Sequence, residues 1–118
     1  MITPEDKILI ENNPVSLATV MHGNKPNLIA VAYVKVCDGD KIVITDNFMN
    51  QTLDDIRNNT NICLACWNKD FEGIKIIGKA EYYTDGEWLQ YVKSLKENEG
   101  CPAKGAIIIR AEKVFRLK

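Results

Sequence analysis

The sequence predicts a mainly β protein, in which six antiparallel strands form a small barrel with short helices at its periphery. Short runs of β-branched and other apolar residues recur along the 118 residues, and turn-forming residues separate them. Three short segments show helical patterns instead. A barrel is favoured because closure removes the exposed edges that six short strands would otherwise present.

The N-terminal segment predicts a short helix. Thr3 is a typical N-cap residue, and Pro4 follows it at the first helical position. The helix has to end before Pro14, because the residue before a proline avoids the helical conformation. We expect Ile8 and Leu9 to face the interior.

The first three strands are predicted at residues 15–21, 27–37 and 41–45. Asp38 and Gly39 lie between two apolar runs, which is a strong signal for a tight hairpin. The second and third strands are therefore expected to be antiparallel neighbours.

The second half of the chain contains three more strands and two helices. One strand alternates between apolar and polar side chains, and the small residues Gly78 and Ala80 on its apolar face indicate that something packs closely there. The elements are a short helix from about Thr52, strands at 61–67 and 74–82, a helix at 85–98 and a last strand at 106–117.

Composition predicts one domain, residues 1–118. The formal net charge is −1, and lysines and arginines are scattered, so we expect no nucleic-acid partner. The polar, acidic N-terminus does not resemble a secretory signal, and no run approaches the ~18 apolar residues of a membrane span. We expect a cytoplasmic protein whose four cysteines are reduced, with no membrane partner.

Metal and hydrolytic sites find little support. Cys63 and Cys66 have the C-x-x-C spacing, but a zinc site needs a second pair. The two cysteines lie in a predicted strand, where residues three apart point to opposite faces, so core packing is favoured over redox chemistry. His22 is the only histidine, and no catalytic residue can be assigned.

The segment from Thr45 to Thr52 is the strongest candidate for a ligand site. It follows an apolar strand and leads into a helix, and such a junction offers unpaired backbone N–H groups and a partial positive charge. Asn50 and Gln51 add hydrogen-bonding side chains. The alternative is a capped helix whose loop faces water, since Thr52 and Asp55 have the spacing of a capping box.

Several short motifs follow one another in order around this segment. They are Thr45 at the end of a strand, the loop 46–51, Thr52 and Asn58-Asn59 in the helix, Cys66-Trp67 at the end of the fourth strand, and residues 77–80 in the fifth. In this order and spacing the chain resembles the FMN-binding split-barrel proteins, which include pyridoxamine 5'-phosphate oxidases and small FMN-binding proteins.

The resemblance implies an FMN cofactor at the interface of a homodimer. The segment from Thr45 to Phe48 would follow the flavin ring and ribityl chain, residues 50–52 would hold the phosphate, and residues 29–31 would pack behind the ring. A second subunit would add a wall from Trp67 and residues 75–77. The implied cofactor-binding residues are Thr45, Asp46, Asn47, Phe48, Met49, Asn50, Gln51, Thr52, Trp67 and Lys75.

Gln51 departs from the family pattern, because many relatives carry a phosphate-binding lysine there. A charge-assisted hydrogen bond contributes roughly 1.5–3 kcal/mol against about 1 for a neutral one, so FMN binding would weaken by about tenfold. Other cations could supply the charge: Lys35, Arg57, Lys75 or Lys79.

The resemblance favours an FMN-dependent oxidoreductase or electron-transfer protein that exchanges electrons with a small molecule or a protein. The alternatives are a non-catalytic flavin- or nucleotide-binding carrier or sensor, and an interaction module without a cofactor. Pyridoxamine-phosphate oxidase activity itself is not expected, since the chain is short and only Arg110 and Arg116 lie near its end. The sequence does not identify the substrate, the electron donor or acceptor, or whether a deazaflavin or haem replaces FMN.

Overall fold

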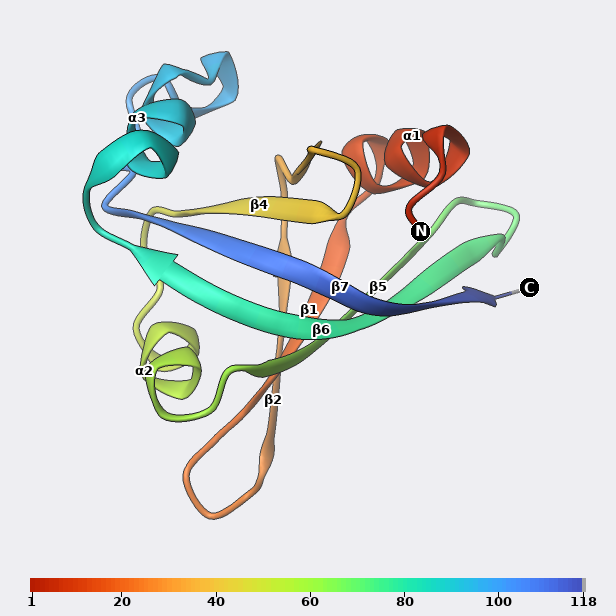
Figure 1. Cartoon of the computed structure of the whole chain (residues 1–118), viewed down its shortest axis with the longest axis horizontal. Coiled ribbons are helices and arrows are strands. Elements are labelled where there is room, and N and C mark those ends of the chain that lie inside the picture. The colour runs from red at the N-terminus through yellow and green to blue at the C-terminus, as the bar shows by residue number, and fades with distance from the viewer. Residues whose placement is uncertain (118) are drawn as a thin grey trace.

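The computed structural model describes residues 1–117. It contains three α-helices, one 3-10 turn and seven strands (Figure 1). In chain order they are α1 (Pro4–Asn12), β1 (Val15–Val20), β2 (Pro26–Val31), β3 (Lys35–Cys37), β4 (Lys41–Asp46), α2 (Gln51–Asn58), β5 (Asn61–Trp67), β6 (Gly73–Tyr83), α3 (Gly86–Ser94), η1 (Lys96–Asn98) and β7 (Gly105–Leu117).

The strands form one antiparallel sheet in the order β2-β1-β5-β6-β7-β4-β3. The sheet is strongly curved: β6 and β7 run across the front of Figure 1, while β1 and β2 pass behind them at a steep angle. The predicted mainly β split barrel with peripheral helices is confirmed.

The barrel has seven strands rather than six, because the strand predicted at residues 27–37 is broken. β2 pairs with β1 at one edge of the sheet, whereas β3 pairs with β4 at the other edge. The chain changes direction between them at Tyr33, whose φ of 59° is unusual for a large side chain. One straight strand could not reach both edges.

The hairpin predicted at Asp38 and Gly39 is confirmed. Both residues have positive φ, 50° and 78°, as expected for a tight turn whose twist matches that of the strands. Lys35 pairs with Val43 and Cys37 with Lys41 across this hairpin.

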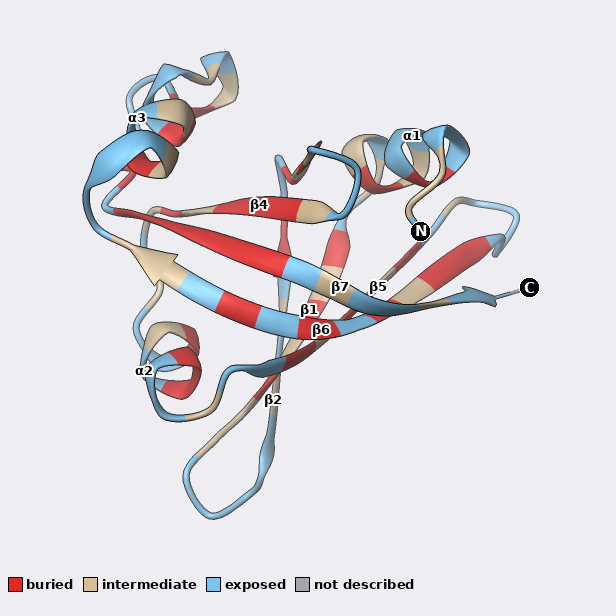
Figure 2. Ribbon diagram, in the orientation of Figure 1, coloured by how far each residue is buried: buried red, intermediate tan, exposed pale blue. Residues whose placement is uncertain are grey.

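Two hydrophobic clusters account for the uninterrupted apolar run in β7. Ile107 and Ile109 belong to the main core inside the curved sheet, whereas Ile108 packs with Leu89 and Val92 of α3 on the other face. All three isoleucines are fully buried, as the red segment of β7 in Figure 2 shows. A strand covered on both faces loses the usual alternation.

Helix α1 begins as predicted, with a reciprocal capping box between Thr3 and Asp6. The expectation that Ile8 faces the interior is wrong, since it is 64% exposed whereas Ile10 is 1% exposed. Asp6 and Ile10 lie four residues apart on the buried face, and Ile8 lies about 200° around the helix from Ile10. Leu9 is partly buried against the core, as expected.

Gly78 is required by the close approach of β7. A Cβ atom at this position would lie 2.2 Å from the carbonyl oxygen of Arg110, next to a bulge between Ile77 and Gly78. The close neighbour is therefore the backbone of β7, the adjacent strand of the same sheet, and not a group packed against the face of β6 as predicted.

The Cys63–Cys66 pair also lies as predicted. Cys66 is buried in the core and Cys63 is half-buried on the opposite face of β5, and both thiols are free. Burial, together with the charge of Asp6, raises the pKa of Cys66 to about 11.

Among residues 1–117, none of the helices has the length and apolar character needed to span a bilayer.

Candidate functional site

A cavity of about 630 Å³ lies between the end of β2, the loop after β4 and the loop that precedes β7. Seven of the eight residues predicted in the segment 45–52 line it, and so do residues 29–31, which were expected behind a flavin ring. The full lining is Ile29, Ala30, Val31, Ala32, Tyr33, Thr45, Asn47, Phe48, Met49, Asn50, Gln51, Thr52 and Cys101.

Asp46 is the member of the segment that does not line the cavity. It is fully buried beneath the loop, where its carboxylate accepts hydrogen bonds from the Met49 N–H (2.8 Å) and the Tyr82 hydroxyl (2.6 Å). Burial and this bond to Asp46 raise the pKa of Tyr82 well above its usual value, so Tyr82 remains a donor. Asp46 thus anchors the loop from below.

The segment before β7 holds the same loop from the side. The Ala103 N–H donates to Asn47 Oδ1 (2.8 Å), and the Lys104 N–H donates to the Asp46 carbonyl (2.9 Å). Lys104 Nζ donates to the Met49 carbonyl (2.6 Å) and lies 3.9 Å from the Asp46 carboxylate. The sequence did not predict these contacts of Ala103 and Lys104 with the loop, and it did not predict Tyr33 and Cys101 in the cavity lining.

The capping box proposed for Thr52 and Asp55 is not formed. Helix α2 begins at Gln51, and its N-cap, Asn50, makes no side-chain bond to the helix. Thr52 Oγ1 accepts a hydrogen bond from Asn27 Nδ2 (3.2 Å) instead, and tertiary contacts have thus replaced the local cap. The helix N–H groups that a capping side chain would occupy are left for another partner.

Asp55 is buried within α2 and has two donors. Its carboxylate accepts from the Thr19 hydroxyl (2.7 Å) and from Gln51 Nε2 (2.6 Å). One N–H and the oxygen of the Gln51 amide remain available toward the cavity. The position at which the family resemblance implies a lysine is therefore a glutamine tied to a carboxylate here.

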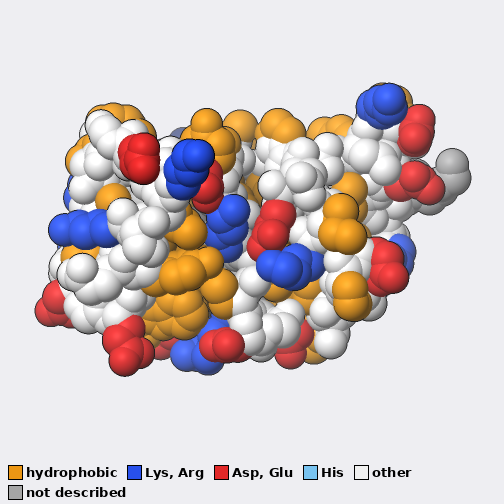
Figure 3. Space-filling view, turned by 90° about the horizontal axis from the view of Figure 1, so that it is seen from above, with side chains coloured by type: hydrophobic (Ala, Val, Ile, Leu, Met, Phe, Trp, Pro, Cys, Tyr) orange, Lys and Arg blue, Asp and Glu red, His pale blue; other side chains and the backbone are white. Residues whose placement is uncertain are grey.

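Within residues 1–117, the cavity lining includes no charged side chain. The four cations considered as substitutes all make contacts elsewhere: Lys35 with Glu97, Arg57 over the Tyr82 ring, Lys75 over the Phe115 ring and Lys79 with Asn61. Lys104 is a cation that does reach the loop, and its charge is shared with Asp46. On the face seen in Figure 3, basic and acidic side chains are likewise interspersed around hydrophobic areas.

Trp67 and Lys75 do not line the cavity of their own chain. They lie toward the other end of β5 and β6, where Trp67 pairs with Gly73 and Lys75 with Phe115 across the strands. Trp67 is 47% exposed and Phe115 is 40% exposed, so this face carries apolar side chains outward.

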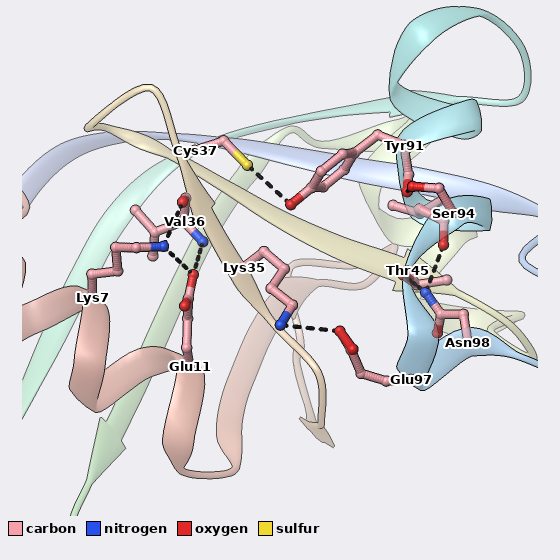
Figure 4. A network of polar contacts seen from close by, with 11 residues as sticks. Lys7, Glu11, Lys35, Val36, Cys37, Thr45, Tyr91, Ser94, Glu97 and Asn98 are labelled. Atoms are coloured by element: carbon pink, nitrogen blue, oxygen red, sulfur yellow. Dashed lines mark hydrogen bonds and ion pairs between the residues drawn. The ribbon is translucent and has the colours of Figure 1, made fainter.

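A polar network connects the end of β4 to the C-terminal side of α3 (Figure 4). Asn98 Nδ2 donates to Thr45 Oγ1 and to the Val92 carbonyl, both at 2.8 Å. Lys35 pairs with Glu97 at 3.0 Å and helps to hold η1 against β3. Further along, Cys37 and the Tyr91 hydroxyl lie 3.5 Å apart, and burial and this contact raise the pKa of Tyr91 to about 12.

Comparisons with known proteins agree with this fold. The family model described as pyridoxamine 5'-phosphate oxidase matches residues 3–118. An uncharacterized protein of Methanocaldococcus jannaschii is 35% identical over 123 aligned positions, which cover 99% of this chain and 81% of that protein.

Among solved structures, HupZ of Group A Streptococcus is 29% identical, with a TM-score of 0.89 over 98% of this chain and 94% of the other. An FMN-binding protein of Syntrophomonas wolfei has the same fold, with a TM-score of 0.80, 14% identity and coverage of 96% and 84%. The chain therefore belongs to the pyridoxamine 5'-phosphate oxidase family and has its split-barrel fold.

Proposed function

We propose that this protein binds a flavin, with FMN as the first candidate, in the cavity formed by residues 45–52. The observation that carries the proposal is that seven of these eight residues and residues 29–31 line one cavity, as the family resemblance implied. The volume, about 630 Å³, lies within the range of small-molecule sites, which is about 300–1,000 Å³.

The lining offers suitable groups along its length. Residues 29–31 supply an apolar wall for a planar ring, and Asn47 and Asn50 supply amides for polar substituents. The Thr52 hydroxyl and the uncapped N–H groups at the start of α2 are donors for a phosphate. Lys104 is the cation that reaches the loop within residues 1–117.

A bound flavin would supply hydride or electron transfer, so the protein itself needs to bind, orient and tune the ring. We therefore propose an oxidoreductase or an electron-transfer protein. Pyridoxamine-phosphate oxidase activity is not part of the proposal.

A non-catalytic flavin carrier or sensor is the second candidate. It is favoured by one observation, that the cavity lining within residues 1–117 contains no histidine, carboxylate or lysine to exchange protons with a substrate. Reduction of the bound flavin by NADH or NADPH would support the enzyme, and a flavin that no physiological donor reduces would support the carrier.

We also propose that the protein functions as a homodimer with the cavities at its interface. Trp67, Ile77 and Phe115 project from the outer face of the sheet and are 47%, 38% and 40% exposed. A shallow groove of about 320 Å³, lined largely by apolar side chains that include Ala18 and Cys63, lies on the same face. Exposed apolar area of this kind marks interaction surfaces. A cytoplasmic location stays a prediction.

The first test is a titration of the purified protein with FMN, monitored by flavin fluorescence, together with its mass by sedimentation. Phe48→Ala and Phe71→Ala form a matched pair, because both rings are exposed (77% and 71%) but only Phe48 lines the cavity. We expect Phe48→Ala to weaken binding about fivefold or more and Phe71→Ala to leave it unchanged. If the protein does not bind FMN, or if the two substitutions weaken binding equally, the cavity is not the flavin site. A flavin-bound monomer would contradict the proposed homodimer.

A further inference from the structure

The side-chain amide of Asn98 has a fixed orientation in the structure. Asn98 is 4% exposed, and its Nδ2 donates one proton to the Val92 carbonyl and the other to Thr45 Oγ1 (Figure 4). A carbonyl can only accept, so reversing the amide would bring two acceptor oxygens together.

The backbone keeps Asn98 in this place. Its N–H donates to the Leu95 carbonyl and its own carbonyl accepts from the Cys101 N–H, both at 3.0 Å. The Oδ1 atom is buried without a hydrogen-bond partner among the described residues. A buried unpaired acceptor is unfavourable, and in return this side chain provides two donors.

The orientation of Asn98 determines what Thr45 can do. A hydroxyl has one proton to donate and two lone pairs, and Asn98 occupies a lone pair of Thr45. No described residue accepts the Thr45 proton, and Thr45 lines the cavity. The proton is therefore available to an acceptor on a ligand.

We infer that Asn98 is a positioning residue: its donated hydrogen bond fixes the Thr45 hydroxyl and leaves the Thr45 proton for an acceptor on the bound ligand. The cavity then selects ligands that present a carbonyl oxygen or an unprotonated ring nitrogen at the end of β4. This inference rests on the proposed flavin function, and it adds one hydrogen-bond donor to the site. A carbonyl oxygen or ring nitrogen of a flavin would be a suitable partner for the Thr45 proton.

The test uses the full chain and riboflavin, titrated by fluorescence, with four single variants and one double variant. Thr45→Val should weaken binding about fivefold to tenfold, as expected for one lost neutral hydrogen bond, and Thr45→Ser should bind like the parent. Asn98→Asp replaces the donor by an acceptor, so the Thr45 proton turns toward residue 98 and a lone pair faces the ligand. It should weaken binding more than Asn98→Ala does.

The decisive comparison is the double variant. If Asn98 acts through Thr45, Asn98→Asp should have no further effect on flavin affinity in the Thr45→Val background. The visible absorption bands of bound flavin should shift alike in Thr45→Val and Asn98→Asp, which a loss of stability alone would not cause. Thermal unfolding of each variant separates effects on stability from effects on affinity. If Asn98→Asp does not fold, Asn98→Ala with and without Thr45→Val provides the same comparison.

The inference is overturned if the Asn98 variants bind riboflavin like the parent. It is also overturned if the double variant loses affinity by the product of the two single-variant factors, since the two residues would then act independently. Either result would leave the flavin proposal intact, because the parent protein would still bind. A parent protein that binds neither riboflavin nor FMN would overturn the proposed function, and this inference with it.

Discussion

Gln51 donates a hydrogen bond of 2.6 Å to the buried carboxylate of Asp55 one helical turn later. The amide of Gln51, which lines the cavity, is thus held by an acid, in a position where the family resemblance implies a lysine.

Gln51→Lys should tighten FMN by about tenfold and leave riboflavin affinity unchanged, because only FMN carries the phosphate that a cation would meet. Fluorescence titrations with both ligands measure the difference. Gln51→Met, which keeps the length without the polar group, is the control. Equal tightening of both flavins would argue that the phosphate lies elsewhere.

Asp55→Ala should lower the free energy of unfolding by about 2–3 kcal/mol, since the buried hydroxyl of Thr19 and the side-chain amide of Gln51 lose their acceptor. Asp54→Ala is the matched control, because Asp54 is the preceding residue and its side chain is 61% exposed. Its effect should stay within about 0.5 kcal/mol. Urea unfolding of the two variants provides the comparison, and equal losses would contradict the role given to Asp55.

Gly78→Ala should destabilise the protein by about 2–3 kcal/mol, because the added Cβ would lie 2.2 Å from the Arg110 carbonyl oxygen and neither strand can move freely. Lys79→Ala, at the exposed neighbouring position, should have little effect. Thermal unfolding of both variants checks this. A Gly78→Ala protein as stable as the parent would show that the bulge in β6 can adjust.

Stability should fall below about pH 4.5 partly through Glu11. Burial alone would raise the pKa of its carboxyl, but the hydrogen bonds from Lys7 and from the Val36 N–H (Figure 4) outweigh burial and lower it below the ordinary 4.5. A lowered pKa in the folded state contributes stability that is complete above the unfolded value and is lost as pH falls through the folded one.

Urea unfolding at pH 6 and at about pH 3.5 should therefore differ less for Glu11→Gln than for the parent. Lys7→Met removes one of the contacts that lower this pKa and should also shrink the difference. An unchanged difference in both variants would assign the acid sensitivity to other carboxylates.

Features with local causes could be predicted from the sequence. The N-cap at Thr3, the Asp38–Gly39 turn and the alternation around Gly78 depend on neighbours a few residues away, and each is present. The segment 45–52 was likewise predicted as a candidate ligand site, and seven of its eight residues line the cavity.

Features set by distant partners could not be predicted in the same way. The break at Tyr33 exists because the two ends of one apolar run pair at opposite edges of the sheet. Thr52 and Asp55 have a local capping pattern, but their side chains instead accept hydrogen bonds from distant residues. Asn27 donates to Thr52, and Thr19 donates to Asp55. The contacts of residues 98–104 with the loop span more than fifty positions and leave no local signal.

The contacts from Ala103 and Lys104 tie the loop, and with it the cavity, to a distant part of the sequence. The groups that hold residues 45–49, from Asn98 to Lys104, lie more than fifty positions later and leave the ribosome after them. The cavity is therefore complete only once the last strand can join the sheet, and its opening requires the loss of long-range contacts rather than local fraying. Ligand binding consequently reports on the folding of the whole sheet, and the amide of Met49, bonded to Asp46, should exchange with solvent as slowly as those of the core.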